Sequence, residues 1–275
     1  MDSQHLHGIL LAVILVIAIS QPAGAATAEE WYEKGLSLYE QGRSADAIDA
    51  YTQAVALDPN VATFWNGLGA AHDHEGEYTA AVRAYDIAIS LDPTDAFAWN
   101  NMGIALGNLG NHTEAVAAFD SAISLDSTNA NIWNARGTAL KALRNYTAAI
   151  ESYDRAIALN PKDAYPWNNM GNILAEMGNV SAAVAAYDRS IELDPNYSSP
   201  WNGKGKALEI LGNSSAANAA YDMASALDSA RAQPSGQHDR DGASQTTQAG
   251  GYPLAVLVVA VGTVILAAGR RRGLL

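Results

Sequence analysis

The stretch Ala96–Asn129 reads AFAWNNMGIALGNLGNHTEAVAAFDSAISLDSTN, and its landmark residues recur along the chain every 34 residues. Each copy carries a tryptophan, a glycine four positions later, an alanine sixteen positions after the tryptophan, and then an aromatic residue. These tryptophans are all those of the protein: Trp31, Trp65, Trp99, Trp133, Trp167 and Trp201. A fixed period of this size indicates a repeat architecture, in which one supersecondary unit is stacked many times.

The spacing of Trp, Gly, Ala, aromatic residue and closing Pro over 34 residues resembles the tetratricopeptide repeat (TPR). The resemblance implies an all-α, right-handed solenoid of six helix-turn-helix repeats. It also implies that the first helices line a concave groove, which takes an extended or helical peptide of a partner protein. The resemblance covers residues 28–231 in six units: 28–61, 62–95, 96–129, 130–163, 164–197 and 198–231.

Within the third unit, apolar residues recur at helical spacing on both sides of Gly110, which predicts two antiparallel helices. Gly103 and Ala115 are expected where these helices approach closely, because a larger side chain would push them apart. Trp99 and Phe119 supply large apolar area, worth about 1.5–3 kcal/mol or more for each side chain that is fully buried.

The two end units differ from the others in ways that mark caps. In the last unit, Asn218 and Ser225 stand where the other units carry β-branched residues, which we expect to cover the next repeat. At the other end, Glu29, Glu30 and Glu33 make the first helix polar. Because the terminal repeats of a solenoid need a polar outer face, we expect the stack to stop at six repeats.

The chain is acidic, with 16 Lys+Arg, 29 Asp+Glu and a formal net charge of −13 at pH 7. Such a surface repels phosphate backbones, so nucleic acid is not an expected partner. The sequence contains no cysteine, which excludes disulfides, thiolate metal sites and cysteine nucleophiles.

Residues 1–25 resemble a secretory signal peptide, because the uncharged run Gly8–Ser20 is followed by a small-residue cleavage site. The residues before this run are atypical, since Asp2, His5 and His7 stand where Lys or Arg is usual. An uncleaved N-terminal anchor is therefore the alternative.

The C-terminal residues predict a membrane anchor. Residues 252–269 are uncharged and rich in Val, Leu and Ala, and a helix of this length spans roughly 27 Å. Arg270–Arg272 should stay on the cytoplasmic side, in a tail of residues 270–275. Residues 232–251 read as a flexible linker. We therefore expect a single-pass protein of the cell membrane with its repeats outside the cytoplasm. The apolar helix with its basic cluster also resembles a surface-sorting signal.

The residue after the tryptophan is asparagine in five units, and two units add a second asparagine. With regular stacking these amides form a ladder along the groove, where an amide can donate to and accept from a peptide backbone. The alternative is that the amides only order neighbouring helices. The candidate groove residues are Asn66, Asn100, Asn101, Asn134, Asn168, Asn169 and Asn202. Lys141 and Lys206 are isolated cations on this face, so a clamp for a C-terminal carboxylate is not expected.

Five Asn-x-Ser/Thr sequences are candidate N-glycosylation sites, and four of them repeat at the 34-residue period. The alternative is that Asn suits the turn and that Ser or Thr suits the N-cap of the second helix. The candidate acceptors are Asn111, Asn145, Asn179, Asn196 and Asn213.

Neither a metal site nor a catalytic site is expected. His72 and His74, with Glu75 and Glu77, are the only cluster that suggests a metal, but side chains two apart on a helix point to different faces. His72 stands where other units carry leucine, which favours a core-facing position. The sequence has no nucleophile motif, no phosphate-binding loop and no spaced acid–base pair, so neither an enzyme nor a cofactor is predicted.

Lys141, Arg144 and Arg136 are predicted to form a small basic spot beside the groove, although solvated charge is the favoured interpretation. The sequence as a whole favours a protein–protein interaction scaffold at the cell surface that binds a peptide segment of its partner. The alternatives are a structural envelope component and an accessory subunit of an exported enzyme or multiprotein assembly complex.

Overall fold

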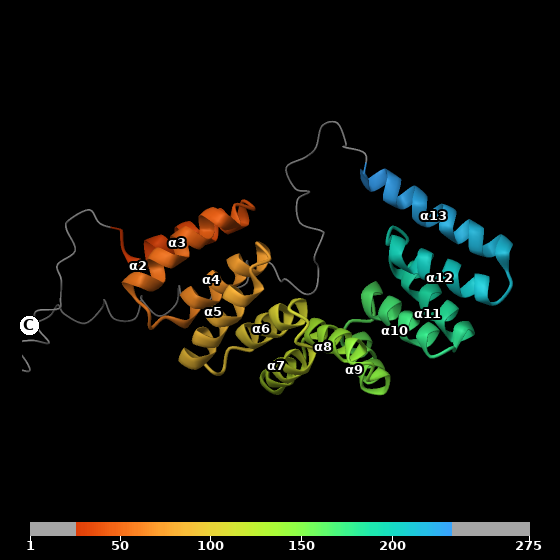
Figure 1. Cartoon of the computed structure of the whole chain (residues 1–275), viewed down its shortest axis with the longest axis horizontal. Coiled ribbons are helices and arrows are strands. Elements are labelled where there is room, and N and C mark those ends of the chain that lie inside the picture. The colour runs from red at the N-terminus through yellow and green to blue at the C-terminus, as the bar shows by residue number, and fades with distance from the viewer. Residues whose placement is uncertain (1–25, 233–275) are drawn as a thin grey trace, which may run out of the picture.

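The computed structural model describes residues 26–232, which form twelve α-helices arranged as six pairs (Figure 1). The first helices of the pairs are α2 (Ala28–Glu40), α4 (Ala62–His74), α6 (Ala96–Asn108), α8 (Ala130–Ala142), α10 (Ala164–Glu176) and α12 (Ser198–Ile210). The second helices are α3 (Ser44–Leu57), α5 (Tyr78–Leu91), α7 (His112–Leu125), α9 (Tyr146–Leu159), α11 (Val180–Leu193) and α13 (Ser214–Ala232). The predicted all-α solenoid of six helix pairs is confirmed.

A tight turn with one left-handed residue connects the two helices of each pair. In the third repeat Gly110 has a φ of 81°, and the N–H of Asn111 donates to the carbonyl of Leu106 at 2.9 Å. This Schellman arrangement satisfies a carbonyl that the end of α6 would leave without a partner. Glycine takes the left-handed place in five repeats, whereas Arg144 takes it in the fourth with a φ of 58°.

The glycine four residues after each tryptophan lets the two helices of a pair approach closely, as predicted. A Cβ atom added to Gly103 would lie 2.7 Å from the Phe119 ring, which is itself buried. The aromatic ring also reaches the next repeat, because a Cβ at Gly67 would lie 2.9 Å from the Tyr51 ring. These rings therefore join helices within a repeat and between repeats.

The tryptophans are half-buried rather than fully buried, and their indole nitrogens hold the loops between repeats. Trp99 Nε1 donates to the carbonyl of Pro93 at 3.1 Å, and the same bond occurs at Trp65, Trp133 and Trp201. Trp167 differs, because its Nε1 is buried without a hydrogen-bond partner. The closing residue of the 34-residue unit thus offers a backbone carbonyl to the tryptophan of the next unit.

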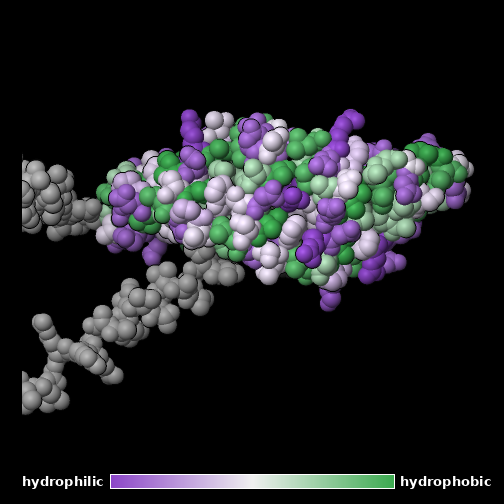
Figure 2. All heavy atoms as spheres, turned by 90° about the horizontal axis from the view of Figure 1, so that it is seen from below, coloured by the Kyte–Doolittle hydropathy of each residue, from purple (hydrophilic) through white to green (hydrophobic). Residues whose placement is uncertain are grey.

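The first helices form the inner layer of the solenoid. Each first helix contacts the first helix of the next repeat, whereas no second helix of the described residues contacts the next second helix. Helices that lie closer together mark the inside of a curved stack, so the first helices line its concave side. Figure 1 shows the resulting curved stack, with α3 and α13 at its upper ends and α7 and α9 at the bottom of its middle. Seen from below, apolar and polar residues are interspersed over the underside (Figure 2).

The ends of the stack agree with the predicted caps, since Asn218, Ser225, Glu29, Glu30 and Glu33 are all exposed. Helix α13 runs to residue 232, so the first residue of the predicted linker (232–251) belongs to the helix. The predicted signal peptide (1–25), the rest of the linker, the transmembrane helix (252–269) and the tail (270–275) lie outside the described residues. Among residues 26–232, no helix is long and apolar enough to cross a membrane.

Candidate functional site

The seven candidate asparagines all lie on first helices, which form the concave layer. Asn100 and Asn168 are almost completely buried, at 2% and 4% exposure. The other five are half-buried: Asn66, Asn101, Asn134, Asn169 and Asn202. The two buried residues therefore act as part of the groove floor, and the half-buried amides are the ones within direct reach of a ligand.

These amides form two separate groups instead of one continuous ladder. Asn101 Nδ2 donates to Asn66 Oδ1 at 3.5 Å and Asn100 Nδ2 donates to Asn101 Oδ1 at 3.3 Å. Two repeats further, Asn169 Nδ2 donates to Asn134 Oδ1 at 3.1 Å.

The row is interrupted because the units without a second asparagine have no amide to extend it. Alanine or glycine stands there instead, and glutamate in the first unit. In the free protein the amides thus link neighbouring first helices, which is the alternative interpretation given above. That they also bind a peptide stays a prediction.

Two exposed aromatic residues lie beside these groups and were missed by the sequence interpretation. Phe97 and Tyr165 are the second residues of α6 and α10, and they are 44% and 40% exposed. The signal for them was present in the sequence, because both stand in the units that carry the double asparagine. An amide group with an adjacent exposed ring is a common way to hold a peptide by its backbone and one side chain.

A titratable group lies near the C-terminal end of α4, around Asp73. Burial raises the pKa of Asp73 to about 6, against hydrogen bonding from Asn108 and the nearby charge of His74, which lower it. The Tyr39 and His74 rings meet edge-on with their centres 5.8 Å apart, and His74 Nδ1 lies 2.9 Å from Ser44 Oγ. Asp73 Oδ1 is buried without a hydrogen-bond partner. Asp73 is therefore protonated more easily than an exposed aspartate.

The histidines of α4 do not converge on one point. His72 is half-buried, and its Nδ1 lies 2.7 Å from Glu77 Oε2, so it is at the edge of the core rather than inside it. His74 instead contacts Ser44 on α3. Among the described residues no group of three or more His, Cys, Asp or Glu side chains could hold a metal ion.

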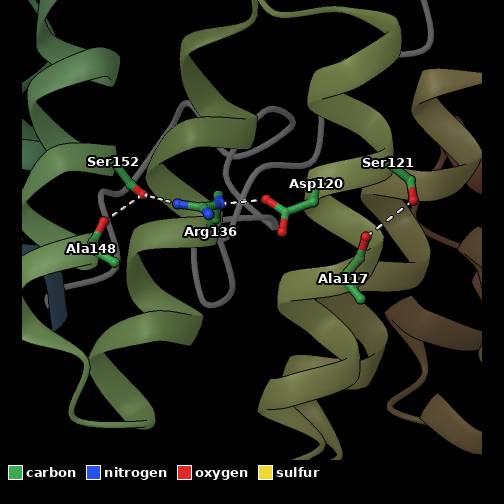
Figure 3. A network of polar contacts seen from close by, with 6 residues as sticks. All are labelled: Ala117, Asp120, Ser121, Arg136, Ala148 and Ser152. Atoms are coloured by element: carbon green, nitrogen blue, oxygen red, sulfur yellow. Dashed lines mark hydrogen bonds and ion pairs between the residues drawn. The ribbon is translucent and has the colours of Figure 1, made fainter.

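The predicted basic spot does not form, because its three members lie in different surroundings. Arg136 Nε lies 2.6 Å from Asp120 Oδ1 on α7, and its Nη1 donates to Ser152 Oγ on α9 at 2.8 Å (Figure 3). Lys141 instead pairs with a glutamate of α10 at 3.5 Å. Arg136 and Lys141 therefore both form ion pairs with a neighbouring helix. Arg144 is exposed in the turn.

The side chain of Arg136 also lines a hollow of about 500 Å³ between α7 and α9. Trp133 and Arg155 line the same hollow, and the Arg155 guanidinium lies 6.0 Å from the Trp133 ring centre. Both acidic and basic side chains line it, so the hollow has no single charge to attract a ligand of one sign.

The candidate glycosylation asparagines are all exposed, and four of them directly precede a second helix. The expected N-cap is wrong in detail: Asn itself occupies the cap, and Ser or Thr stands inside the first turn. Asn145 and Asn213 accept from backbone N–H groups at 3.5 and 3.2 Å, whereas Asn111 and Asn179 make no side-chain cap bond. The fifth, Asn196, lies in the turn before α12. Whether these side chains carry glycans stays a prediction.

The fold and the face just described define a helical-repeat scaffold, and comparison with known proteins gives its family. One tetratricopeptide repeat model matches residues 32–96, and a second matches residues 96–129 and 164–197. A third model, of the TPR repeat, matches residues 138–178. The chain is a TPR repeat protein and, as such, a protein–protein interaction scaffold.

Similar solved structures include MamA, at 25% identity and a TM-score of 0.55, over 60% of this chain and 96% of that one. A second is YrrB, described as a TPR protein with an unusual peptide-binding site, at 23% identity and a TM-score of 0.53. That match covers 66% of this chain and 94% of YrrB, and at this identity it supports the fold alone.

Among curated proteins, the E3 ubiquitin-protein ligase CHIP of Arabidopsis thaliana is 42% identical over 48 residues, which are 18% of this chain. The match spans 17% of the length of that relative, so its ligase activity does not carry over to this chain. The TPR domain is typically non-catalytic, and TPR domains bind peptides or proteins.

Proposed function

We propose that this chain captures a peptide segment of a partner protein along its concave face. The observation that carries the proposal is the inner layer of first helices, on which half-buried amides lie beside the exposed rings of Phe97 and Tyr165. An amide pairs with peptide backbone of any sequence, and a ring adds a preference for an apolar side chain.

The charges of the face favour an internal segment over a free C-terminus. Lys141 is already paired with Glu176. On α12, Lys204 is paired with Asp188 at 2.6 Å, and Lys206 is exposed. A terminal carboxylate is recognised by several converging cations, which this face does not assemble.

The test is replacement of the half-buried amides Asn134 and Asn169 by alanine, followed by co-purification of the partner from the native cell. A matched control replaces the exposed Thr52 and Ser124 of the second helices. We expect the groove variant to lose the partner while its helical content and the control remain unchanged. Full retention of the partner by the groove variant would refute the proposal.

We also propose that the repeats are exported and tethered to the membrane by residues 252–269, and that the exposed sequons receive glycans. The uncharged run of residues 8–20 and the Arg cluster after residue 269 support this arrangement. Protease added to intact cells should then degrade the repeats, and mass spectrometry should find modified Asn111 and Asn145 peptides. Repeats protected until the cells are lysed would contradict export, and unmodified peptides would contradict glycosylation.

A further inference from the structure

Helix α12 begins without the side-chain cap that the three preceding first helices have. Asp95, Asn129 and Asp163 each accept a hydrogen bond from the first turn of their helix. Tyr197 stands at the same place of the 34-residue unit before α12 and makes no cap bond. Because a side-chain cap stabilises the start of a helix, tyrosine at this place weakens that start and calls for another role.

The side chain of Tyr197 lies instead on the concave face of repeat five. Its ring packs against the exposed ring of Tyr165 on α10, with the ring centres 4.9 Å apart. Its hydroxyl accepts from Asn168 Nδ2 at 3.1 Å, and burial raises the pKa of Tyr197. Tyr197 thus joins the loop before α12 to one of the two buried amides of the groove.

Half of the Asn168 amide has no partner. The residue is 4% exposed, and its Oδ1 is buried without a hydrogen bond. Turning the amide over would pair Oδ1 with the Tyr197 hydroxyl, but Nδ2 would then lack an acceptor. An unpaired buried polar atom is destabilising, and the native fold keeps one such atom in either orientation of the amide.

Repeat three provides the comparison within the same chain. Phe97 and Asn100 occupy the places of Tyr165 and Asn168, but Asn129 stands where Tyr197 is and caps α8. Asn100 Nδ2 donates to its neighbour Asn101. The arrangement of two rings around an incompletely paired amide is therefore particular to repeat five.

We propose that Tyr165, Asn168 and Tyr197 form a subsite that takes one apolar residue of the bound peptide. The peptide unit of that residue supplies the hydrogen bond that Asn168 lacks, and its side chain packs on the Tyr165 ring. With Nδ2 paired to the Tyr197 hydroxyl, the N–H of the peptide unit donates to Asn168 Oδ1. Tyr197 shifts enough to admit the ligand and remains the second wall of the subsite, so that the ligand side chain lies between the rings of Tyr165 and Tyr197. This subsite rests on the proposed function, since it lies in the peptide groove.

The probe is N-acetyl-phenylalanine methylamide, which has backbone N–H groups and one aromatic side chain. Its analogue methylated at every amide nitrogen is the matched control ligand, because it donates no hydrogen bond. Binding to the full-length protein is followed by NMR with tyrosine and asparagine side chains isotopically labelled. We expect shifts at Tyr165, Asn168 and Tyr197 with the probe, and at least about tenfold weaker binding of the methylated analogue.

The decisive variant is Tyr197→Asn, which copies the cap at Asn129. It regains a cap but loses the hydrogen bond to Asn168, so its fold is checked by circular dichroism, and it should bind the probe about tenfold more weakly. Tyr165→Ala changes an exposed side chain and should weaken the probe without unfolding the helix. Tyr146→Phe, at the first residue of α9, is the control that leaves binding unchanged.

Equal response of the parent chain and Tyr197→Asn, or equal response to both ligands, would overturn the subsite, as would no response at all. The partner assay separates this failure from that of the proposed function. If Tyr197→Asn keeps the partner and Asn134→Ala/Asn169→Ala loses it, the groove stands and the subsite falls. If the probe binds as expected but the groove variant keeps its partner, the subsite stands and the proposed function falls.

Discussion

Replacing Arg144 by glycine should stabilise the solenoid, although it removes a side chain. Arg144 has a φ of 58°, at the place where the other five repeats have glycine with φ between 73° and 81°. A left-handed backbone costs a residue with a Cβ about 1–2 kcal/mol. The greater conformational freedom of glycine in the unfolded chain offsets about 0.5–1 kcal/mol of the strain that is relieved. The expected net gain is therefore about 0.5–1 kcal/mol.

Thermal unfolding followed by circular dichroism measures this gain. For a chain of this size, 1 kcal/mol corresponds to about 2–4 °C, so Arg144→Gly should raise the midpoint by about 1–4 °C. A solenoid need not unfold in one step, so the gain is also followed by hydrogen exchange. Relative to the parent chain, Arg144→Gly should slow exchange in α8 and α9 more than in the end repeats.

The reverse exchange, Gly178→Arg, is the matched control for this prediction. Gly178 has a φ of 79°, and a Cβ added there would meet nothing within 4 Å, so only the backbone preference changes. It should lower the midpoint by a similar amount. If Gly178→Arg behaves in this way while Arg144→Gly leaves the midpoint unchanged or lowers it, the Arg144 side chain makes a stabilising contact and the strain argument is wrong.

Three further substitutions test the packing and the charges. Gly103→Ala places a Cβ 2.7 Å from the Phe119 ring and should destabilise by about 1–3 kcal/mol, seen as a lower urea midpoint; an unchanged midpoint would refute the close approach. Arg136→Met copies the residue of the flanking repeats and should change stability by less than about 1 kcal/mol in the same assay, because its carboxylate partner is exposed; a larger loss would give the ion pair more weight. Asp73 has a folded-state pKa raised to about 6, so its contribution to stability is present below about pH 4 and is lost as the pH rises through 6. Asp73→Asn should therefore raise the melting temperature more at pH 7 than at pH 4, and an equal change at both would contradict the raised pKa.

The period of the sequence was sufficient to predict the fold, because it marks where each helix begins, ends and packs. The glycine at position 103 and the ring at position 119 follow from their spacing alone, since the close approach of the helices needs both. Even the left-handed turn at Arg144 could have been found, because glycine occupies its place in every other repeat.

The candidate site was less predictable, because its contacts join residues of different repeats. The pairing of Asn169 with Asn134 depends on the offset between neighbouring first helices, which the sequence period does not give. Tyr197 reads as a turn residue, and its contact with Tyr165 is visible only when the loop and α10 are placed in space. Arg136 reads as surface charge until α7 and α9 are seen on either side of it (Figure 3).

The most direct test of the peptide groove is site-specific photo-crosslinking in intact cells. One photoreactive residue replaces Thr138, which is exposed one turn after Asn134 on the concave face of α8. A second, in a separate variant, replaces the exposed Ser124 of α7 in the outer layer. We expect the residue at 138 to crosslink one discrete partner protein and the residue at 124 not to. Crosslinking of the partner from position 124 but not from position 138 would contradict this expectation.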